Sequence, residues 1–323
     1  MTGKAYDQKL DALLALRNDP GSPEVVPQLR KALRDRSNYY VAKAAALVAE
    51  FVLIGLKQDL VDAFDRFLAG GAKLDPQCWA KQAIAAALAG LGHDDPAIFI
   101  KGTEHFQPEP VWGGQQDTAI RLRGICTLAL VQCKLSEHEL LTRLVDLLGD
   151  PEKGVRMEAI RAIGQCTGRD SVLLLRVKAT AGDSEPEVIG QCLTTLLEID
   201  ADEQVGYVMG FLNDSDDLRF EALAALSECR DPSAAKALID ALDRDEYHAV
   251  RDEIFQALGR SRHKQAIDFL ADVIENGNTS DAAACIKAIA GGPQRDEIRE
   301  RIEQIVKRRG NDALAKKFHS AFQ

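Results

Sequence analysis

The chain has 323 residues, of which 46% are hydrophobic and 6% aromatic, and its formal net charge is −10. This hydrophobic content excludes an extensively disordered chain, and the acidic balance disfavours non-specific binding of nucleic acid, which needs Lys and Arg to displace counterions from phosphates. The charge is uneven, with a net −2 over residues 1–160 and a net −8 over residues 161–323. Because Ala and Leu dominate the apolar positions, the composition favours helices over strands.

The N-terminal segment predicts a lone amphipathic helix over residues 5–17, which would cover the first repeat of an array. Charges recur every few residues there, and no apolar core of a signal peptide is visible. The later apolar stretch Val41–Leu56 is interrupted by Lys43 and Glu50 and is too short to span a bilayer. We therefore expect a cytoplasmic protein that does not enter a membrane.

From about residue 23 to residue 290 the sequence repeats one frame with a period near thirty residues. The clearest copy has an Asp in a turn (Asp150), a cation six residues later (Arg156) and a small residue three further on (Ala159). This period suits two antiparallel helices with two turns, and it is too short for a βαβ unit with a further strand pair. The marker positions of the successive copies are Lys43, Lys81, Arg123, Arg156, Ile189, Arg219, Arg251 and Ala282.

Helix-start signals recur in step with this frame. Asp-Pro dipeptides at 75–76, 95–96, 150–151 and 231–232 place a capping Asp before a Pro in the first turn of a helix. Two further segments, Ser136–Glu139 and Ser184–Glu187, read as capping boxes. The apolar spacing within each copy is helical, so the pattern predicts helix pairs throughout.

The segment Thr103–Asp117 falls in the longest interval of the array and is the most unusual stretch of the chain. Its two prolines and the Gly113–Gly114 pair forbid a regular helix, so the extra residues form a loop within a repeat. One interpretation is an amphipathic anchor for a partner, because insertions in solenoids often mark the binding face. The alternative is a loop folded back into a gap in the core, with Trp112 buried. The anchor residues would be His105, Phe106 and Trp112.

The cation of each copy has two interpretations. One cation per repeat could line a surface that grips an acidic peptide or a phosphate backbone. The matched acids favour the other interpretation, in which each cation bonds the turn Asp and the pairs form a ladder that sets the geometry of the repeats. The ladder would consist of Asp75 with Lys81, Asp117 with Arg123, Asp150 with Arg156, Asp214 with Arg219, and Asp245 with Arg251.

Six of the seven cysteines occupy two equivalent columns of the frame, so they are predicted to be buried as small hydrophobic residues. The first column contains Cys126, Cys192 and Cys285, and the second contains Cys133, Cys166 and Cys229. No C-x-x-C pair is present, and we predict no metal site and no cofactor. Beyond the last copy, residues 294–323 are strongly charged, as expected of a solvated C-terminal cap.

The turn Asp, the Val155–Arg156 pair and the small-residue column at Ala159 and Ala222 resemble the HEAT-repeat superfamily, including the bacterial HEAT-like repeats first named for phycobilin lyases. The resemblance implies an all-α fold, an α-solenoid of about eight helix-pair repeats. It further implies one domain over residues 1–323, with an N-terminal cap over 1–22, repeats over 23–290 and a C-terminal cap over 291–323.

Another HEAT-repeat family, the deoxyhypusine hydroxylases, binds two iron ions with several His-Glu pairs. This chain has a single such pair, His138-Glu139, so that activity is not expected. It also has no P-loop, no G-x-S-x-G motif and no H-E-x-x-H motif. The sequence thus predicts no catalytic residue.

The predicted function is a non-catalytic scaffold or adaptor that binds a protein through the solenoid surface. Five acidic residues crowd two turns, and a partner with a basic segment would suit them. The alternative is a HEAT-like enzyme or enzyme component, similar to a DNA base glycosylase or a bilin lyase, although nucleic acid is not an expected partner. The acidic binding residues are Asp214, Asp216, Asp217, Asp245 and Glu246.

Overall fold

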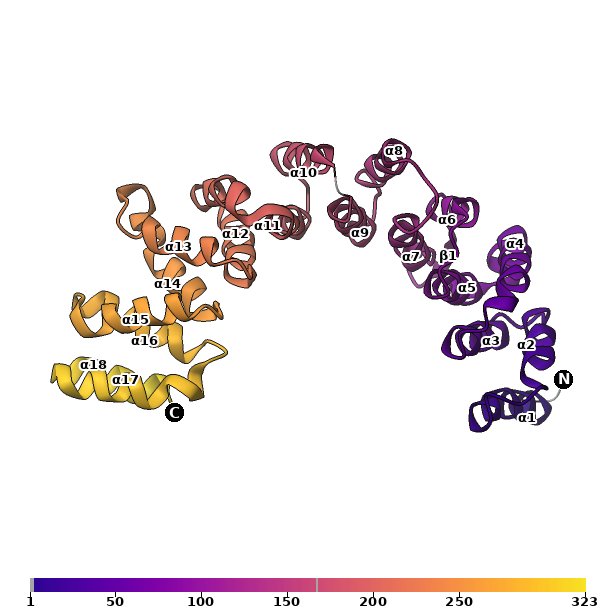
Figure 1. Cartoon of the computed structure of the whole chain (residues 1–323), viewed down its shortest axis with the longest axis horizontal. Coiled ribbons are helices and arrows are strands. Elements are labelled where there is room, and N and C mark those ends of the chain that lie inside the picture. Colours follow the sequence, from indigo (N-terminus) through magenta and orange to yellow (C-terminus); the bar gives the residue numbers. More distant parts are fainter. Residues whose placement is uncertain (1–2, 167) are drawn as a thin grey trace. The chain divides into compact units, whose positions relative to one another are not determined.

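The computed structural model describes residues 3–166 and 168–323, and in these residues helices joined by short turns form nearly the whole fold (Figure 1). The chain forms two compact units, residues 1–166 and 167–323. Each unit is a stack of helix pairs in two layers. The prediction of an all-α solenoid is confirmed.

Unit 1 begins with α1 and continues as four repeats. Helices α3, α5, α7 and α9 pack in succession as one layer, and α2, α4, α6 and α8 lie along the other side of the unit (Figure 1). The helices are α1 (Gly3–Leu14), α2 (Val25–Leu33), α3 (Asn38–Glu50), α4 (Lys57–Leu74), α5 (Trp79–Gly90), α6 (Pro96–Thr103), α7 (Ile120–Leu130), α8 (Glu137–Leu147) and α9 (Lys153–Gly164).

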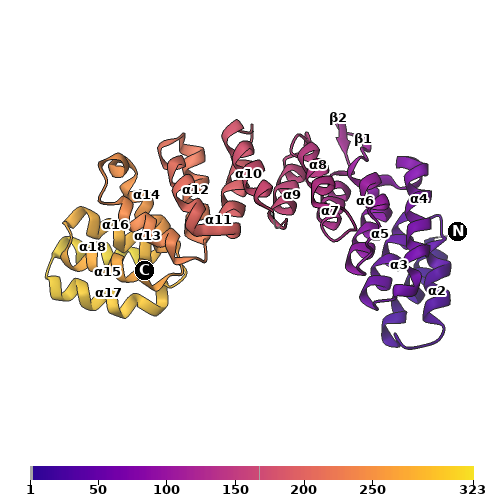
Figure 2. The ribbon, with the colours of Figure 1, turned by 45° about the horizontal axis from the view of Figure 1, so that its top comes forward.

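A β-hairpin interrupts this helical pattern between α6 and α7. Strand β1 (Pro108–Val111) pairs antiparallel with β2 (Gly114–Asp117), with Pro108 opposite Asp117 and Val111 opposite Gly114. The hairpin lies in the unusual segment that the sequence predicts to be a loop. Figure 2 shows it projecting beside α6, α7 and α8.

Unit 2 repeats the two-layer arrangement. Helices α12, α14, α16 and α18 form one layer, and α13, α15 and α17 form the other. In α11 the backbone of Asp200 is non-helical and kinks the helix. The helices are α10 (Arg169–Ala181), α11 (Pro186–Met209), α12 (Asp216–Glu228), α13 (Pro232–Ala241), α14 (Arg251–Arg260), α15 (Lys264–Asn276), α16 (Thr279–Ala290), α17 (Arg295–Arg309) and α18 (Asp312–Ala321).

Small residues allow the layer helices to approach closely. Ala159 and Ala222 are fully buried, as are the column cysteines Cys126, Cys192 and Cys285. Burial raises the pKa of the Cys192 thiol to about 12, so this thiol is protonated at neutral pH. The cysteines of the first column therefore act as buried small hydrophobic residues, as predicted, whereas Cys133, Cys166 and Cys229 of the second column are only partly buried.

The two ends of the chain differ in how they pack. Helix α1 begins at residue 3 and ends at residue 14, close to the predicted 5–17. The charged C-terminal segment does not form a fully solvated cap, since α17 and α18 pack against α15 and α16 and bury Ile302 and Phe318. The sequence does not reveal these buried positions, because only a few apolar residues lie among many charged ones. No helix in the described part of the chain has both the length and the apolar character needed to cross a membrane.

Candidate functional site

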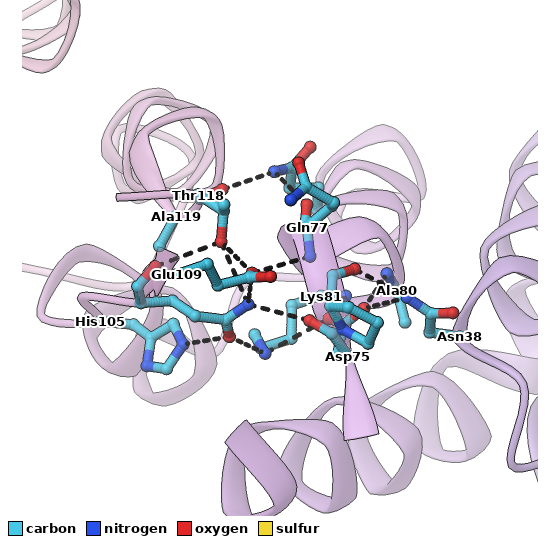
Figure 3. A network of polar contacts seen from close by, with 12 residues as sticks. Asn38, Asp75, Gln77, Ala80, Lys81, His105, Glu109, Thr118 and Ala119 are labelled. Carbon is cyan, nitrogen blue, oxygen red and sulfur yellow. Dashed lines mark hydrogen bonds and ion pairs between the residues drawn. The ribbon is translucent and has the colours of Figure 1, made fainter. Parts of the chain in front are cut away.

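A fully buried carboxylate, Asp75, lies where α4 leads into α5 (Figure 3). It accepts hydrogen bonds from the backbone amides of Ala80 (2.9 Å) and Lys81 (3.0 Å), and from the side-chain amide of Asn38 (3.0 Å). The Lys81 ammonium, also fully buried, lies 3.3 Å from the same carboxylate. Asn38 starts α3 and Asp75 precedes α5, so this cluster joins two consecutive repeats.

Residues at the base of the hairpin provide a second hydrogen-bond partner for the Lys81 ammonium. The Gln107 side-chain oxygen accepts a hydrogen bond from Lys81 Nζ (2.7 Å), and its amide nitrogen donates to the backbone carbonyl of Asp75 (2.9 Å) and to Glu109 Oε1 (2.7 Å). Thr118 Oγ1 donates to the same Glu109 oxygen (2.6 Å) (Figure 3). Burial alone would raise the pKa of Glu109, but these bonds outweigh it and hold the pKa below its usual value.

Glu109 also fixes an unusual turn. Its Oε1 accepts a hydrogen bond from the backbone amide of Gln77 (2.7 Å). Gln77 and Cys78 both have left-handed backbones, with φ of 61° and 56°, and a non-glycine residue in this region is strained. Burial raises the pKa of Cys78 to about 12, so its thiol is not reactive at neutral pH. The hairpin therefore holds a turn that local preferences alone disfavour.

Arg123 of α7 forms the next part of the network and is fully buried. Its guanidinium bonds Asp117 at the end of β2 and donates to both oxygens of Asp150 in the following repeat, at 2.8 and 3.2 Å. Burial would raise the pKa of Asp117, but bonds from Arg123 and two backbone amides outweigh it and lower the pKa. The guanidinium carbon also lies 4.1 Å from the centroid of the Phe106 ring.

Within unit 1, Lys81 lies against Asp75 and Arg123 against Asp117, as the frame predicts. Arg156 instead donates to the backbone carbonyl of Asp150 (2.8 Å), whose carboxylate accepts from Arg123. The partner of a cation is thus set by which repeat offers a carboxylate at hydrogen-bonding distance.

Unit 2 departs further from the predicted pairing. Arg251 bonds Asp281 of the next repeat at 2.8 and 3.0 Å rather than Asp245, which lies exposed on a 3-10 turn. Arg219 bonds Asp216 and Glu253 rather than Asp214. Asp245 keeps the six-residue spacing but lies in a 3-10 turn, and Asp214 is only five residues before Arg219, so carboxylates at other positions replace the predicted acids.

The hairpin presents its apolar tip to solvent. Trp112 has a relative exposure of 104%, and Val111 and Phe106 are about half exposed. Gly113 adopts a φ of 90°, which permits the tight turn that reverses the chain at this tip. The interpretation in which Trp112 fills a gap in the core is therefore wrong. His105 lies at the base, where burial lowers its pKa and Gln107 is its partner at 3.3 Å.

Two further exposed aromatic residues lie at the same end of this layer. Tyr39, near the start of α3, and Trp79, at the start of α5, have ring centroids 5.6 Å apart in an edge-to-face pair. They are 36% and 48% exposed. Tyr40, the neighbour of Tyr39, is buried instead, and the sequence does not reveal that Trp79 lies beside Tyr39. We call Tyr39, Trp79, Phe106 and Trp112 the aromatic edge.

Gln107, Glu109 and Thr118 do not stand out in the sequence, although they hold the hairpin in place. The available signal is that Pro108 and Pro110 flank Glu109, because a residue before Pro favours an extended backbone. Alternation along that strand turns Glu109 inward between two outward prolines. Which groups it meets depends on the neighbouring repeat.

The five acidic residues predicted to bind a partner are exposed in unit 2. Asp214, Asp216 and Asp217 follow the 3-10 helix η4 (Gly210–Asn213), and Asp245 and Glu246 begin η5 (Asp245–Val250). The two 3-10 helices contact each other, so the structure brings the acidic turns together. Arg219 and Arg244 offset part of their charge.

Among the described residues, 3–166 and 168–323, no three His, Cys, Asp or Glu side chains are grouped so that they could hold a metal ion. The His138-Glu139 pair lies in the first turn of α8. There Glu139 forms the predicted capping box, since its carboxylate accepts from the Ser136 amide (3.0 Å) and its own amide donates to Ser136 Oγ (3.3 Å).

Comparison with known proteins identifies the repeats. Residues 173–259 and 212–290 match the family model of HEAT repeats. A comparison with curated protein sequences found no match. Among solved structures, the complex of CpcE and CpcF of phycocyanin lyase from Nostoc sp. PCC7120 is 15% identical, with a TM-score of 0.33, over 75% of this chain and 93% of that one.

Two other solved structures are similar at the same low level. An engineered protein is 17% identical with a TM-score of 0.34, over 97% of this chain and 91% of that one. Human deoxyhypusine hydroxylase in complex with glycerol is 18% identical with a TM-score of 0.28, over 86% of this chain and 88% of that one. The resemblance to the HEAT-repeat superfamily is confirmed by the family model, and this chain is an α-solenoid whose residues 173–290 are HEAT repeats.

Proposed function

We propose that this helical-repeat protein is a non-catalytic scaffold or adaptor, and that the aromatic edge of unit 1 binds a protein partner. The observation that carries the proposal is the fully exposed Trp112 on a hairpin whose base is held by buried polar groups. Exposing an indole forgoes the free energy of burying it, so a partner that covers Trp112 would recover that free energy.

The hairpin supports this proposal because its conformation is already fixed. Glu109 bonds Gln77 on one side and Thr118 on the other, and Gln107 bonds both Glu109 and Asp75. A partner would therefore bind a pre-organised loop and lose little affinity to ordering it. Trp and Tyr are also the residues most often found at the energetic centre of protein interfaces.

The first experiment is affinity purification of the intact chain from extract of its source cells, with mass spectrometry and a nuclease-treated control. We expect a stoichiometric protein that survives nuclease. Trp112→Ala should weaken that complex at least about tenfold, since truncating a central Trp costs roughly 2 kcal/mol or more. Leu173→Ala is the control, because Leu173 is 61% exposed in unit 2 and belongs neither to the aromatic edge nor to the acidic turns.

Each other outcome has a definite meaning. Equal loss in the Trp112→Ala and Leu173→Ala variants would contradict a role for the hairpin. Recovery of nucleic acid, a pigment or a small molecule instead of a protein would contradict the scaffold and favour an enzyme or enzyme component. A glycosylase-like function would also require a complex in a gel shift at low salt.

We further propose that the paired acidic turns of unit 2 contribute to binding a partner with a basic segment. Replacing Asp214, Asp217 and Asp245 by Asn removes three exposed carboxylates from the two touching turns. The affinity for such a partner should fall several-fold, and its dependence on salt should flatten, because exposed charges are screened by ions. Unchanged affinity and salt dependence, measured by titration at two ionic strengths, would contradict this surface.

A further inference from the structure

Three arginines of unit 2 converge on one groove. Arg260 ends α14, Arg262 follows it, and Arg230 follows the end of α12. The groove has a volume of about 700 Å³ and runs past the C-terminal ends of α12, α14 and α16. It lies at the opposite ends of these helices from the acidic turns. We call it the arginine groove.

These three guanidinium groups differ from several other arginines of unit 2. Arg219, Arg251 and Arg301 each bond a carboxylate. The side chains of Arg230, Arg260 and Arg262, by contrast, are exposed. They form no hydrogen bond or ion pair within the described part of the chain. Each therefore keeps its five N–H donors for another molecule.

Cations near helix C-termini are favourable because the last carbonyls carry partial negative charge. This effect accounts for the placement of Arg260 at the end of α14, but it is not a reason for three guanidiniums to share one groove. Cations that line one groove repel each other, although solvent and salt weaken the repulsion, and an anion that lies between them would relieve it. Among the groove residues, Glu228 supplies the one carboxylate.

One wall of the groove is fixed by His263. Its Nε2 lies 2.9 Å from the backbone carbonyl of Cys229, so the N–H is on that nitrogen and donates to the carbonyl. This bond ties the start of α15 to the end of α12. The arginines therefore project from turns whose backbone is held across two repeats, not from free loops.

A neighbouring groove limits what the arginine groove can bind. It has a volume of about 830 Å³ and shares Glu228, Cys229 and Arg230 with the arginine groove. Its other lining residues include the acids Glu198, Asp200, Asp202 and Asp231. A long polyanion such as nucleic acid would extend from the arginines into these carboxylates and be repelled. A short anionic group would not.

We propose that the arginine groove binds a short run of carboxylates on a protein partner. Guanidinium groups bind carboxylates through paired N–H donors, and such charge-assisted bonds are stronger than neutral ones. Packed helices lie about 8–10 Å apart, so arginines on successive repeats match carboxylates about three residues apart in a polyproline II conformation, where such residues share one face. This site lies in unit 2 and does not depend on the hairpin of unit 1.

The test uses the full chain and a short fluorescent peptide with consecutive glutamates flanked by Gly and Ser. Fluorescence anisotropy in about 50 mM salt, where exposed charges are weakly screened, should show saturable binding. The same peptide with glutamines in place of the glutamates should not bind. The double variant R260Q/R262Q should lower the affinity about tenfold or more.

The matched control is R121Q/R299Q, which makes the same change of charge at exposed positions of α7 and α17. It should change the affinity by less than about twofold, and circular dichroism should show that both double variants remain folded. Absence of glutamate-peptide binding, or equal loss in the two double variants, would overturn the proposal. The proposal would also be overturned if a single-stranded oligonucleotide bound more tightly than the glutamate peptide and the R260Q/R262Q variant weakened that binding.

Discussion

Replacing Arg123 by Met is expected to lower the free energy of unfolding of unit 1 by about 3–5 kcal/mol. The guanidinium is fully buried and bonds both Asp117 and Asp150. The Met side chain has similar length but no donors, so both carboxylates would lose their ionic partner inside the fold. Leaving a buried charge uncompensated costs far more than the intact pair contributes.

Urea unfolding followed by tryptophan fluorescence measures this effect, because both tryptophans of the chain, Trp79 and Trp112, belong to unit 1. Arg121→Met is the control, since Arg121 is exposed on the same helix and its loss should change stability by less than about 0.5 kcal/mol. A loss below about 1 kcal/mol for Arg123→Met would mean that water reaches the two carboxylates and replaces the guanidinium.

The second large effect is expected for Asp75→Ala. This substitution removes the acceptor for the amides of Ala80 and Lys81 and for the side chain of Asn38. It leaves the Lys81 ammonium bonded to Gln107, without a carboxylate. We expect a loss of about 3–5 kcal/mol, because a buried ammonium without a carboxylate is strongly unfavourable.

Asp95→Ala separates the loss of a helix cap from the loss of a buried charge pair. Asp95 caps α6 through one bond to the amide of Ala97 (3.0 Å) and is exposed. Losing a cap costs about 1 kcal/mol, so the difference between the two variants reports the buried pair. Equal losses in the same urea titration would show that Asp75 acts as a cap alone. Lys81→Met, combined with Asp75→Ala, should recover part of the stability.

Local signals in the sequence predicted local structure well. The Asp-Pro dipeptides at 95–96 and 231–232 begin α6 and α13, where Asp95 and Asp231 accept the expected backbone bonds. The capping box of Ser136 and Glu139 is present as predicted. These interactions join residues a few positions apart, so neighbouring residues determine them.

Three other local signals were overridden. Asp150-Pro151 is predicted to start a helix, but α9 begins at Lys153 with Glu152 as its N-cap residue. Asp75-Pro76 was predicted to start a helix, but left-handed backbones at Gln77 and Cys78 delay α5 until Trp79. The amide of Gln77 bonds Glu109 of the next repeat, which the local sequence does not reveal. Ser184 was predicted as a cap, but α11 begins at Pro186 with Glu185 as its N-cap residue, one position later.

The candidate site was predicted in part because its residues act across repeats. The prolines and glycines of the hairpin exclude a helix, and Trp112 was identified as unusual. The contacts of the hairpin with Gln77 and Asp75, in the preceding repeat, determine which of its side chains face inward and whether Trp112 is buried. Likewise, Arg251 bonds Asp281 of the next repeat while Asp245 lies exposed in a 3-10 helix, although the six-residue spacing of Asp245 and Arg251 fits the frame.

The chain of buried bonds in unit 1 has a mechanical consequence. A stack of helix pairs can stretch like a spring when neighbouring pairs separate, and each separation within this unit must break the bonds that cross it. Asn38 to Asp75, Gln107 to Asp75, and Arg123 to Asp150 cross three successive junctions. Under a pulling force these junctions should therefore yield together at high load, and the repeats from α3 to α9 should behave as one stiff segment.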